Sequence, residues 1–152
     1  MRKLLVIGYG NPLRRDDGIG WHIAQELLRS RQLPNVETIA RIQLTPELAE
    51  PISRANVVLF IDASRECPAG QIRQGRILPQ ETKPALNHHV TAEALLQLAD
   101  DVYYAKPEAY VFSVGVESFA YGTEPSPALA AAYPSLVARV REFIHCHVKV
   151  SA

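Results

Sequence analysis

The chain alternates short, continuous apolar runs with segments whose apolar residues recur at helical spacing. Such short runs are typical of strands buried on both faces of a sheet. They predict strands over residues 3–9, 36–44, 55–63 and 109–116, with a more exposed strand over 71–78. The run over 55–63 is the strongest of them, and Asp62 stands at its carboxyl end.

Apolar residues at intervals of three and four predict helices between these strands. The predicted helices cover residues 18–31, a short stretch near Leu48, residues 91–102, and the chain from residue 128 onward. Thr91 is suited to cap the third of these helices. Pro134 is expected to break or kink the last one. Residues 117–127, rich in Gly, Ser and Pro, predict a loop.

Strands that alternate with helices predict an α/β fold. We expect one three-layer α/β/α domain over residues 1–152, with a mostly parallel or mixed central sheet flanked by helices on both faces. The length of 152 residues is enough for a single core. The chain contains no internal repeat or low-complexity tract that would suggest a second domain.

The charge balance restricts the class of partner. Sixteen basic residues balance sixteen acidic ones, and charged residues make up 21% of the chain. A protein that binds nucleic acid through phosphate contacts usually has a basic surplus. The sequence therefore argues against a nucleic-acid partner.

The cysteines and the start of the chain indicate a reducing compartment. Cys67 and Cys146 stand far apart and form no disulfide framework and no metal-binding spacing. The apolar run of residues 4–7 ends at Gly8 and is too short for a signal core or a membrane span. We expect a cytoplasmic protein with no membrane partner.

Three polar features follow predicted strands or precede a predicted helix. They are the glycine-rich loop with Asp16 and Asp17, the strand-end Asp62, and the pair His88-His89. Ligands of open α/β sheets gather beyond the carboxyl ends of the strands. Two carboxylates and an imidazole from separate elements would make a three-ligand metal site with open positions.

Each feature also has a structural interpretation. Asp16 or Asp17 would serve as a cap of the first helix, Asp62 as a turn residue, and the histidines as solvated loop residues. Gly8 and Gly10 suggest a dinucleotide-binding loop, but the third glycine of that fingerprint falls at Leu13. The two glycines instead indicate a tight backbone path close to a site.

The segment Gly8-Tyr-Gly-Asn-Pro-Leu-Arg-Arg-Asp-Asp-Gly-Ile-Gly20 resembles the opening signature of the nickel–iron hydrogenase maturation proteases. The resemblance continues in order through residues 60–63, through Asn87-His-His-Val-Thr91 with Leu95-Leu96, and through residues 114–119. It closes at Gly122 with Ser126-Pro127 and so extends over almost the whole chain.

The resemblance implies a ligand set, position by position. Asp17 matches the second acidic residue of the signature, and Asp62 matches the strand-end aspartate. The family histidine precedes a Leu-Leu pair by seven residues, which points to His88. Asn87 replaces the serine or threonine that usually precedes that histidine, so His89 stays open as an alternative.

The resemblance also implies an activity. Members of this family remove the C-terminal extension of the large-subunit precursor after nickel insertion. Asp17, Asp62 and His88 would engage nickel supplied by that substrate, with zinc or cadmium as possible replacements in vitro. Asp16 is a candidate general base of this aspartate-dependent endopeptidase. The family resemblance favours a monomer.

Two rival functions use the same residues differently. A peptidyl-tRNA hydrolase-like esterase shares the Gly-x-Gly-Asn-Pro opening, with His22 as its only candidate histidine downstream. A non-catalytic nickel-binding maturation factor would use the same three ligands but bind metal alone. A cysteine protease is disfavoured, because neither Cys67 nor Cys146 has a suitable histidine partner.

Overall fold

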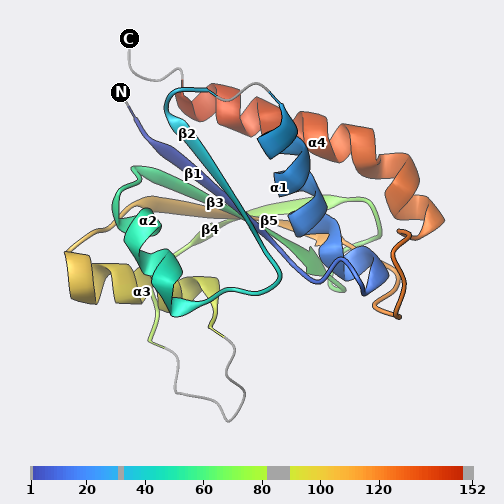
Figure 1. Cartoon of the computed structure of the whole chain (residues 1–152), viewed down its shortest axis with the longest axis horizontal. Helices are drawn as coiled ribbons and strands as arrows, with labels where there is room; N and C mark the ends of the chain where they lie inside the picture. Colours follow the sequence, from blue (N-terminus) through green and yellow to red (C-terminus); the bar gives the residue numbers. More distant parts are fainter. Residues whose placement is uncertain (1, 31–32, 82–89, 149–152) are drawn as a thin grey trace.

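A mixed five-stranded sheet with the strand order β2-β1-β3-β5-β4 lies at the centre of the computed structural model, which describes residues 2–30, 33–81 and 90–148 (Figure 1). The strands are β1 (Leu4–Tyr9), β2 (Val36–Arg41), β3 (Val57–Ser64), β4 (Ile72–Ile77) and β5 (Glu108–Gly115). Strands β1, β2, β3 and β5 run parallel, whereas β4 pairs with β5 in the antiparallel sense. The predicted mixed sheet is confirmed.

Helices cover both faces of the sheet (Figure 1). They are α1 (Ile19–Arg29), α2 (Ala49–Ser53), α3 (Ala92–Tyr103) and α4 (Pro127–Val148). Short 3-10 helices, η1 (Arg15–Gly18) and η2 (Pro46–Leu48), precede α1 and α2. Helices α1 and α4 lie on one face of the sheet, and α2 and α3 lie on the other.

Alternating residues of the central strands build the two cores. Leu4 and Val6 of β1 face α1 and α4, whereas Leu5 and Ile7 face α2 and α3. The same division holds along β3, where residues 57–61 are all fully buried. Burial on both faces explains why these strands appear in the sequence as continuous apolar runs.

The predicted break of α4 at Pro134 is not observed. The helix continues through this residue as one element from Pro127 to Val148. Its apolar stripe packs on the sheet on both sides of the proline, with Leu129 before it and Leu136 after it. Packing therefore outweighs the local cost of one missing backbone hydrogen bond.

Helix α1 approaches the sheet very closely at two glycines. A Cβ atom on Gly8 would collide with the carbonyl oxygen of Gly20, and one on Gly20 would collide with the carbonyl oxygen of Ile61. The start of α1 is thereby held against the ends of β1 and β3. The prediction that the glycines of this region permit a tight backbone path is confirmed.

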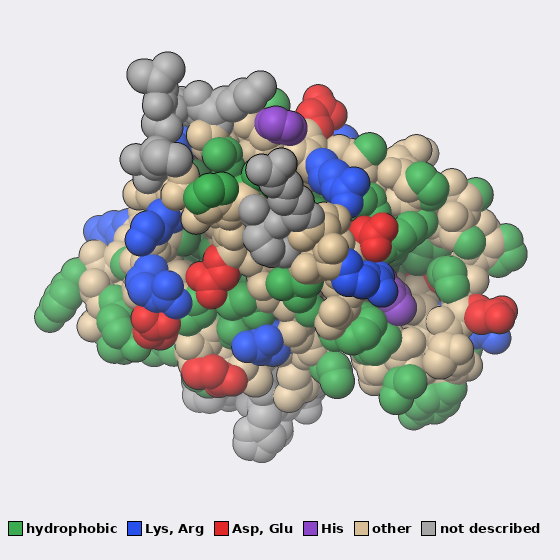
Figure 2. Space-filling view, turned by 45° about the horizontal axis from the view of Figure 1, so that its top comes forward, with side chains coloured by type: hydrophobic (Ala, Val, Ile, Leu, Met, Phe, Trp, Pro, Cys, Tyr) green, Lys and Arg blue, Asp and Glu red, His purple; other side chains and the backbone are tan. Residues whose placement is uncertain are grey.

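Charged side chains of both signs are interspersed on the surface shown in Figure 2. On this face, the described Lys and Arg side chains do not gather into a basic stripe. None of the described helices is long and apolar enough to cross a membrane.

Candidate active site

The loop after β1 is folded around Asp17. Gly10 adopts a φ of 144°, and a Cβ atom there would collide with the backbone carbonyl of Asp17. The backbone N–H of Asn11 donates to Oδ2 of Asp17 at 2.9 Å, and Asn11 Oδ1 accepts from the N–H of Leu13 at 2.9 Å. The half-buried Asp17 carboxylate is thus fixed by the loop that precedes it.

The interpretation of Asp16 or Asp17 as a side-chain cap does not match the structure. Gly18 is the N-cap residue of α1, and neither η1 nor α1 has a side-chain capping hydrogen bond. Both aspartates lie in the first turn of η1, so their charges still favour the helix dipole.

Asp62 lies near the end of β3, next to the end of β1. The hydroxyl of Tyr9, the last residue of β1, donates to Asp62 Oδ2 at 3.0 Å. Asp62 Oδ1 is buried and has no hydrogen-bond partner among the described residues. A buried carboxylate oxygen without a donor is costly, so this oxygen is free to accept a cation or a proton.

Burial is the largest influence on Asp62 and raises its pKa to about 6. The hydroxyl groups of Tyr9 and Ser113 oppose this shift, while the negative charges of Glu93 and Asp17 add to it. Burial, and then the charge of Asp62, raise the pKa of the Tyr9 hydroxyl. Tyr9 therefore stays protonated and serves as a donor to Asp62.

Asp17 and Asp62 line one cavity of about 370 Å³, which we call the carboxylate cavity. Its other lining residues are Tyr9, Gly10, Asn11, Arg14, Ile42, Gln43, Leu44, Ala63 and Val90. The sheet order reverses at β1, with β2 on one side and β3 on the other. The cavity thus lies at the topological switch point, where ligands of open α/β sheets bind.

The predicted histidines, His88 and His89, lie outside the described residues. Val90, the next residue, lines the carboxylate cavity. Among the His, Cys, Asp and Glu side chains of the described residues, no group of three could hold a metal ion. The described Asp, Glu, His or Cys side chains that line the cavity are therefore those of Asp17 and Asp62, and the choice between the histidines stays a prediction.

Asp16 has a different environment from Asp17. Its side chain is 0% exposed, and its carboxylate accepts four hydrogen bonds: from the N–H groups of Glu117, Ser118 and Ser126 and from the Ser126 hydroxyl. Burial opposes ionisation, but these hydrogen bonds together lower the pKa of Asp16. Such a carboxylate is a weak base, and the contacts favour a structural role over the general-base role expected for it.

Sequence reasoning missed Tyr9 and Glu93 as parts of this site. Tyr9 was included in the first strand as one more apolar residue, although a tyrosine at a strand end beside a glycine loop can present its hydroxyl to a site. Glu93 lies in the first turn of α3 and acts on Asp62 and Tyr9 through its charge. Only the order of the strands brings α3 to this edge of the sheet.

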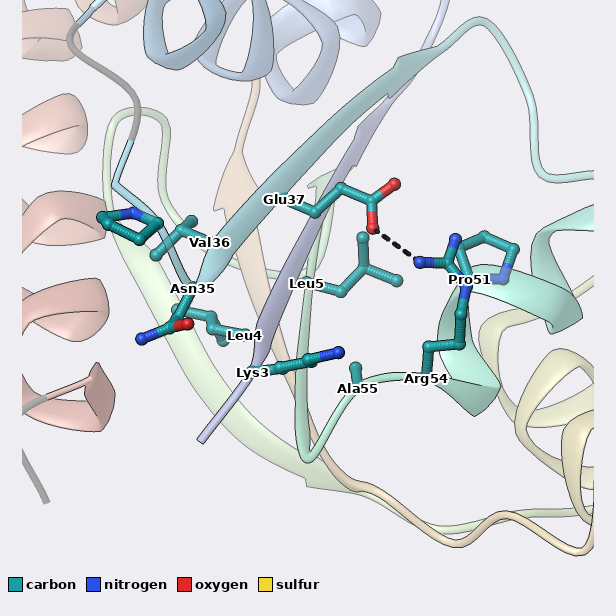
Figure 3. Close-up of a pocket in the computed structure, with 10 residues that line it drawn as sticks. Lys3, Leu4, Leu5, Asn35, Val36, Glu37, Pro51, Arg54 and Ala55 are labelled. Atoms are coloured by element: carbon teal, nitrogen blue, oxygen red, sulfur yellow. Dashed lines mark ion pairs between the residues drawn. The ribbon is translucent and has the colours of Figure 1, made fainter. Parts of the chain in front are cut away.

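A second cavity, of about 190 Å³, lies at the opposite, amino edge of the parallel strands (Figure 3). Lys3, Val36 and Ala55 line it, and Glu37 and Arg54 point toward each other across it, with 3.8 Å between Oε2 and Nη1. Ligands of open α/β sheets bind beyond the carboxyl ends of the strands, so the carboxylate cavity is favoured over this one as the functional site.

Solved structures share this fold over nearly the whole chain. A [NiFe] hydrogenase maturation protease, HycI from Thermococcus kodakarensis KOD1, has a TM-score of 0.76 at 17% identity, with 93% of this chain and 91% of that chain covered. The hydrogenase maturating endopeptidase HybD from E. coli has a TM-score of 0.73 at 22% identity, with 91% and 89% covered. An endopeptidase from Escherichia coli has a TM-score of 0.69 at 24% identity, with the same coverage of 91% and 89%.

No family model matches the chain, and no curated protein matches it in sequence. The comparison is therefore one of structure, and identities below 25% establish the fold alone. Together with the ordered motifs, it confirms the resemblance at the level of three-dimensional structure. The chain has the fold of the nickel–iron hydrogenase maturation endopeptidases.

Proposed function

We propose that this protein is an endopeptidase that removes the C-terminal extension from the nickel-loaded large-subunit precursor of a nickel–iron hydrogenase. One observation carries the proposal: two carboxylates, Asp17 of η1 after β1 and Asp62 near the end of β3, line one cavity at the switch point of the sheet. The shared fold with maturation endopeptidases supports the reaction type.

The donor set fits nickel that arrives with the substrate. Asp62 Oδ1 is buried and lacks a partner among the described residues, and the Asp17 carboxylate lines the same cavity. His88, or alternatively His89, is proposed to add an imidazole from the segment before Val90. Two carboxylates and one imidazole form a weak cage for nickel, so groups of the precursor would complete the coordination.

The residues of the protein prepare the site for this substrate. Tyr9 donates to Asp62 Oδ2 and leaves Oδ1 without a donor among the described residues, so Oδ1 would be available to a cation. The Asn11 N–H orients the Asp17 carboxylate, which lines the same cavity. A divalent cation so placed polarises a carbonyl group or lowers the pKa of a bound water. Recognition of the metal and positioning of the scissile bond thus fall to the same carboxylates.

The direct test is cleavage of the nickel-loaded precursor by the purified protein. Asp17→Asn and Asp62→Asn should fold normally and lower kcat/KM by about a hundredfold or more, because each removes a charged ligand. Asp101→Asn, on the exposed side of α3, is the matched control and should cleave as the wild type does. Absence of cleavage by the wild-type protein with its cognate precursor would refute the protease assignment.

The esterase alternative loses its histidine in this geometry. The His22 ring lies against Trp21 with 5.1 Å between ring centroids. His22 lines a separate cavity with Ile19 and Tyr133 and does not line the carboxylate cavity. The nickel-binder alternative is tested by calorimetry, since submicromolar affinity for nickel without precursor would favour it.

A further inference from the structure

A second hollow adjoins the carboxylate cavity. Arg14, Asp17, Arg65 and Phe119 line this arginine hollow, whose volume is about 300 Å³. Arg14 and Asp17 also line the carboxylate cavity, so the two hollows are neighbours. A peptide bound with its scissile bond at the two aspartates can therefore extend into the arginine hollow.

The Arg14 guanidinium is held by the loop between β5 and α4. Its Nε donates to the backbone carbonyl of Phe119 at 3.1 Å, and its Cζ lies 5.3 Å from the centroid of the Tyr121 ring. The backbone on both sides is also tied to this loop, because the Arg15 N–H donates to the carbonyl of Gly122 at 2.9 Å and the Gly122 N–H donates to that of Leu13 at 2.9 Å. Arg14 is thus positioned before any ligand arrives.

The Arg65 guanidinium is held by the same loop from the other side. Arg65 directly follows Ser64, the last residue of β3, and its Cζ lies 4.3 Å from the centroid of the Phe119 ring. A guanidinium that stacks on an aromatic face keeps its N–H groups in the plane available for an anion. Phe119 therefore connects the two arginines, through its carbonyl to one and its ring to the other.

Neither guanidinium has a carboxylate partner within the described part of the chain. The ion pairs of that part involve Arg2, Arg29 and Arg54 instead. Arg14 and Arg65 are both exposed, so water and ligands can reach them. Two preorganised guanidinium groups outnumber the single carboxylate of the hollow, that of Asp17, and leave it with a net attraction for anions.

Apolar side chains flank the same region. Leu13 is 61% exposed and Tyr121 is 81% exposed. Leu13 precedes Arg14 in the chain, and the Tyr121 ring lies against Arg14. Exposed apolar side chains beside a basic hollow suit a peptide that presents hydrophobic side chains next to a carboxylate.

We propose that the arginine hollow binds a carboxylate of the extension that is removed, either an acidic side chain or its C-terminal carboxylate. The inference rests on the proposed function and adds a determinant of client choice to it. Arg14 and Arg65 act on binding of the extension and stand apart from the carboxylates at the scissile bond.

The test compares wild type with Arg14→Gln, Arg65→Gln and the double variant on the nickel-loaded precursor. Each single change should raise KM about tenfold with kcat nearly unchanged, because one charge-assisted contact made equally in the ground and transition states is lost. Arg65→Lys should restore part of the affinity, since it keeps the charge without the guanidinium fork. Arg139→Gln is the matched control and should leave KM unchanged, because Arg139 is an exposed arginine of α4 that donates to Gln74 of β4 and does not line either hollow.

Two altered precursors identify the source of the carboxylate. One carries amides in place of the acidic side chains of its extension, and the other carries a C-terminal amide. The precursor that lacks the recognised group should raise the KM of wild type about as much as the double variant does with the unaltered precursor, and it should show no further rise with the double variant. The inference would be overturned if the arginine variants cleave with an unchanged KM. It would also be overturned if the arginine changes and both substrate changes raise KM independently of each other. Loss of cleavage by wild type would instead refute the proposed function.

Discussion

At the scale of single residues, Asp62 is held in an environment that disfavours its charge. Burial raises its pKa to about 6, and Oδ1 has no hydrogen-bond partner among the described residues. A group kept under such conditions costs stability and is characteristic of functional sites. The cost should be measurable without any substrate.

Asp62→Asn should stabilise the metal-free protein near neutral pH. The unfolded carboxyl has a pKa of 3.8, and the folded one has a pKa of about 6. Between these values the folded protein keeps a proton that the unfolded chain releases, so the contribution of Asp62 to stability falls as pH rises. At pH 7 the variant should gain on the order of 2 kcal/mol in the free energy of unfolding, and this gain should vanish near pH 3.5.

Urea denaturation of both proteins across this pH range measures the difference. All other titrating groups are shared, so the difference between the two curves isolates Asp62. A constant difference from pH 3.5 to pH 7 would show that the carboxyl has no raised pKa in the folded state.

The sequence indicated both aspartates but not their surroundings. Asp62 and the loop with Asp16 and Asp17 could be located because they follow buried apolar runs, whose carboxyl ends meet at one edge of a parallel sheet. The choice of Asp17 over Asp16 came from the family resemblance. The bond from Tyr9 to Asp62 could not be predicted, because it joins residues 53 positions apart across two paired strands. Asp16 and Asp17 are identical neighbours in the sequence and differ in where their side chains point, which depends on the backbone of η1.

At the scale of elements, Asp16 connects the start of α1 to the loop that leads into α4. Its carboxylate accepts from three backbone N–H groups and from the Ser126 hydroxyl. This loop carries Phe119 and Tyr121, which hold the two arginines of the arginine hollow. The geometry of both hollows therefore depends on this buried carboxylate.

Asp16→Ala should lower the free energy of unfolding by about 3 kcal/mol or more, because several buried donors lose their acceptor. The same hydrogen bonds lower the pKa of Asp16. Its contribution to the free energy of unfolding is therefore present above pH 3.8 and is lost as pH falls through the folded pKa. The variant should lack this contribution at every pH. Chemical denaturation measures the change, and Asp101→Ala on the surface should shift stability by less than about 0.5 kcal/mol. A variant that is as stable as wild type but inactive would instead support Asp16 as a general base.

The elements differ in how well the sequence predicted them. Strand β1 and the first five residues of β3 emerged as apolar runs because burial on both faces leaves no polar positions in them. The cap of α3 was also predicted, and the Thr91 hydroxyl accepts from the N–H of Ala94 at 3.1 Å. The continuation of α4 through Pro134 was not, because local propensity argues against it and only packing on β-strands sustains it.

At the scale of the whole molecule, the strand order decides where function is located. The order β2-β1-β3 makes β1 and β3 neighbours (Figure 1). Residues that follow β1 and residues at the end of β3 line the carboxylate cavity. The pattern of apolar runs predicts a mixed sheet but carries no information on which strands are neighbours. The strand order is therefore a finding of the structure.

The cavities at the amino and carboxyl ends of the parallel strands can be compared to test this location of the active site. The amino-edge cavity contains an ion pair, Glu37 with Arg54, whose side chains are about half exposed. Glu37→Gln should change the free energy of unfolding by less than about 1 kcal/mol, because exposed ion pairs contribute little and Arg54 keeps its shorter contact with Glu50. Cleavage of the precursor should be unaffected, since β1 and β2 run their full length between this pair and the carboxylate cavity. Parallel assays of Glu37→Gln and Asp62→Asn, each a loss of one carboxylate charge, decide between the edges. A loss of cleavage in the first with retention in the second would place the active site at the amino edge, and the assignment of Asp17 and Asp62 would then be wrong.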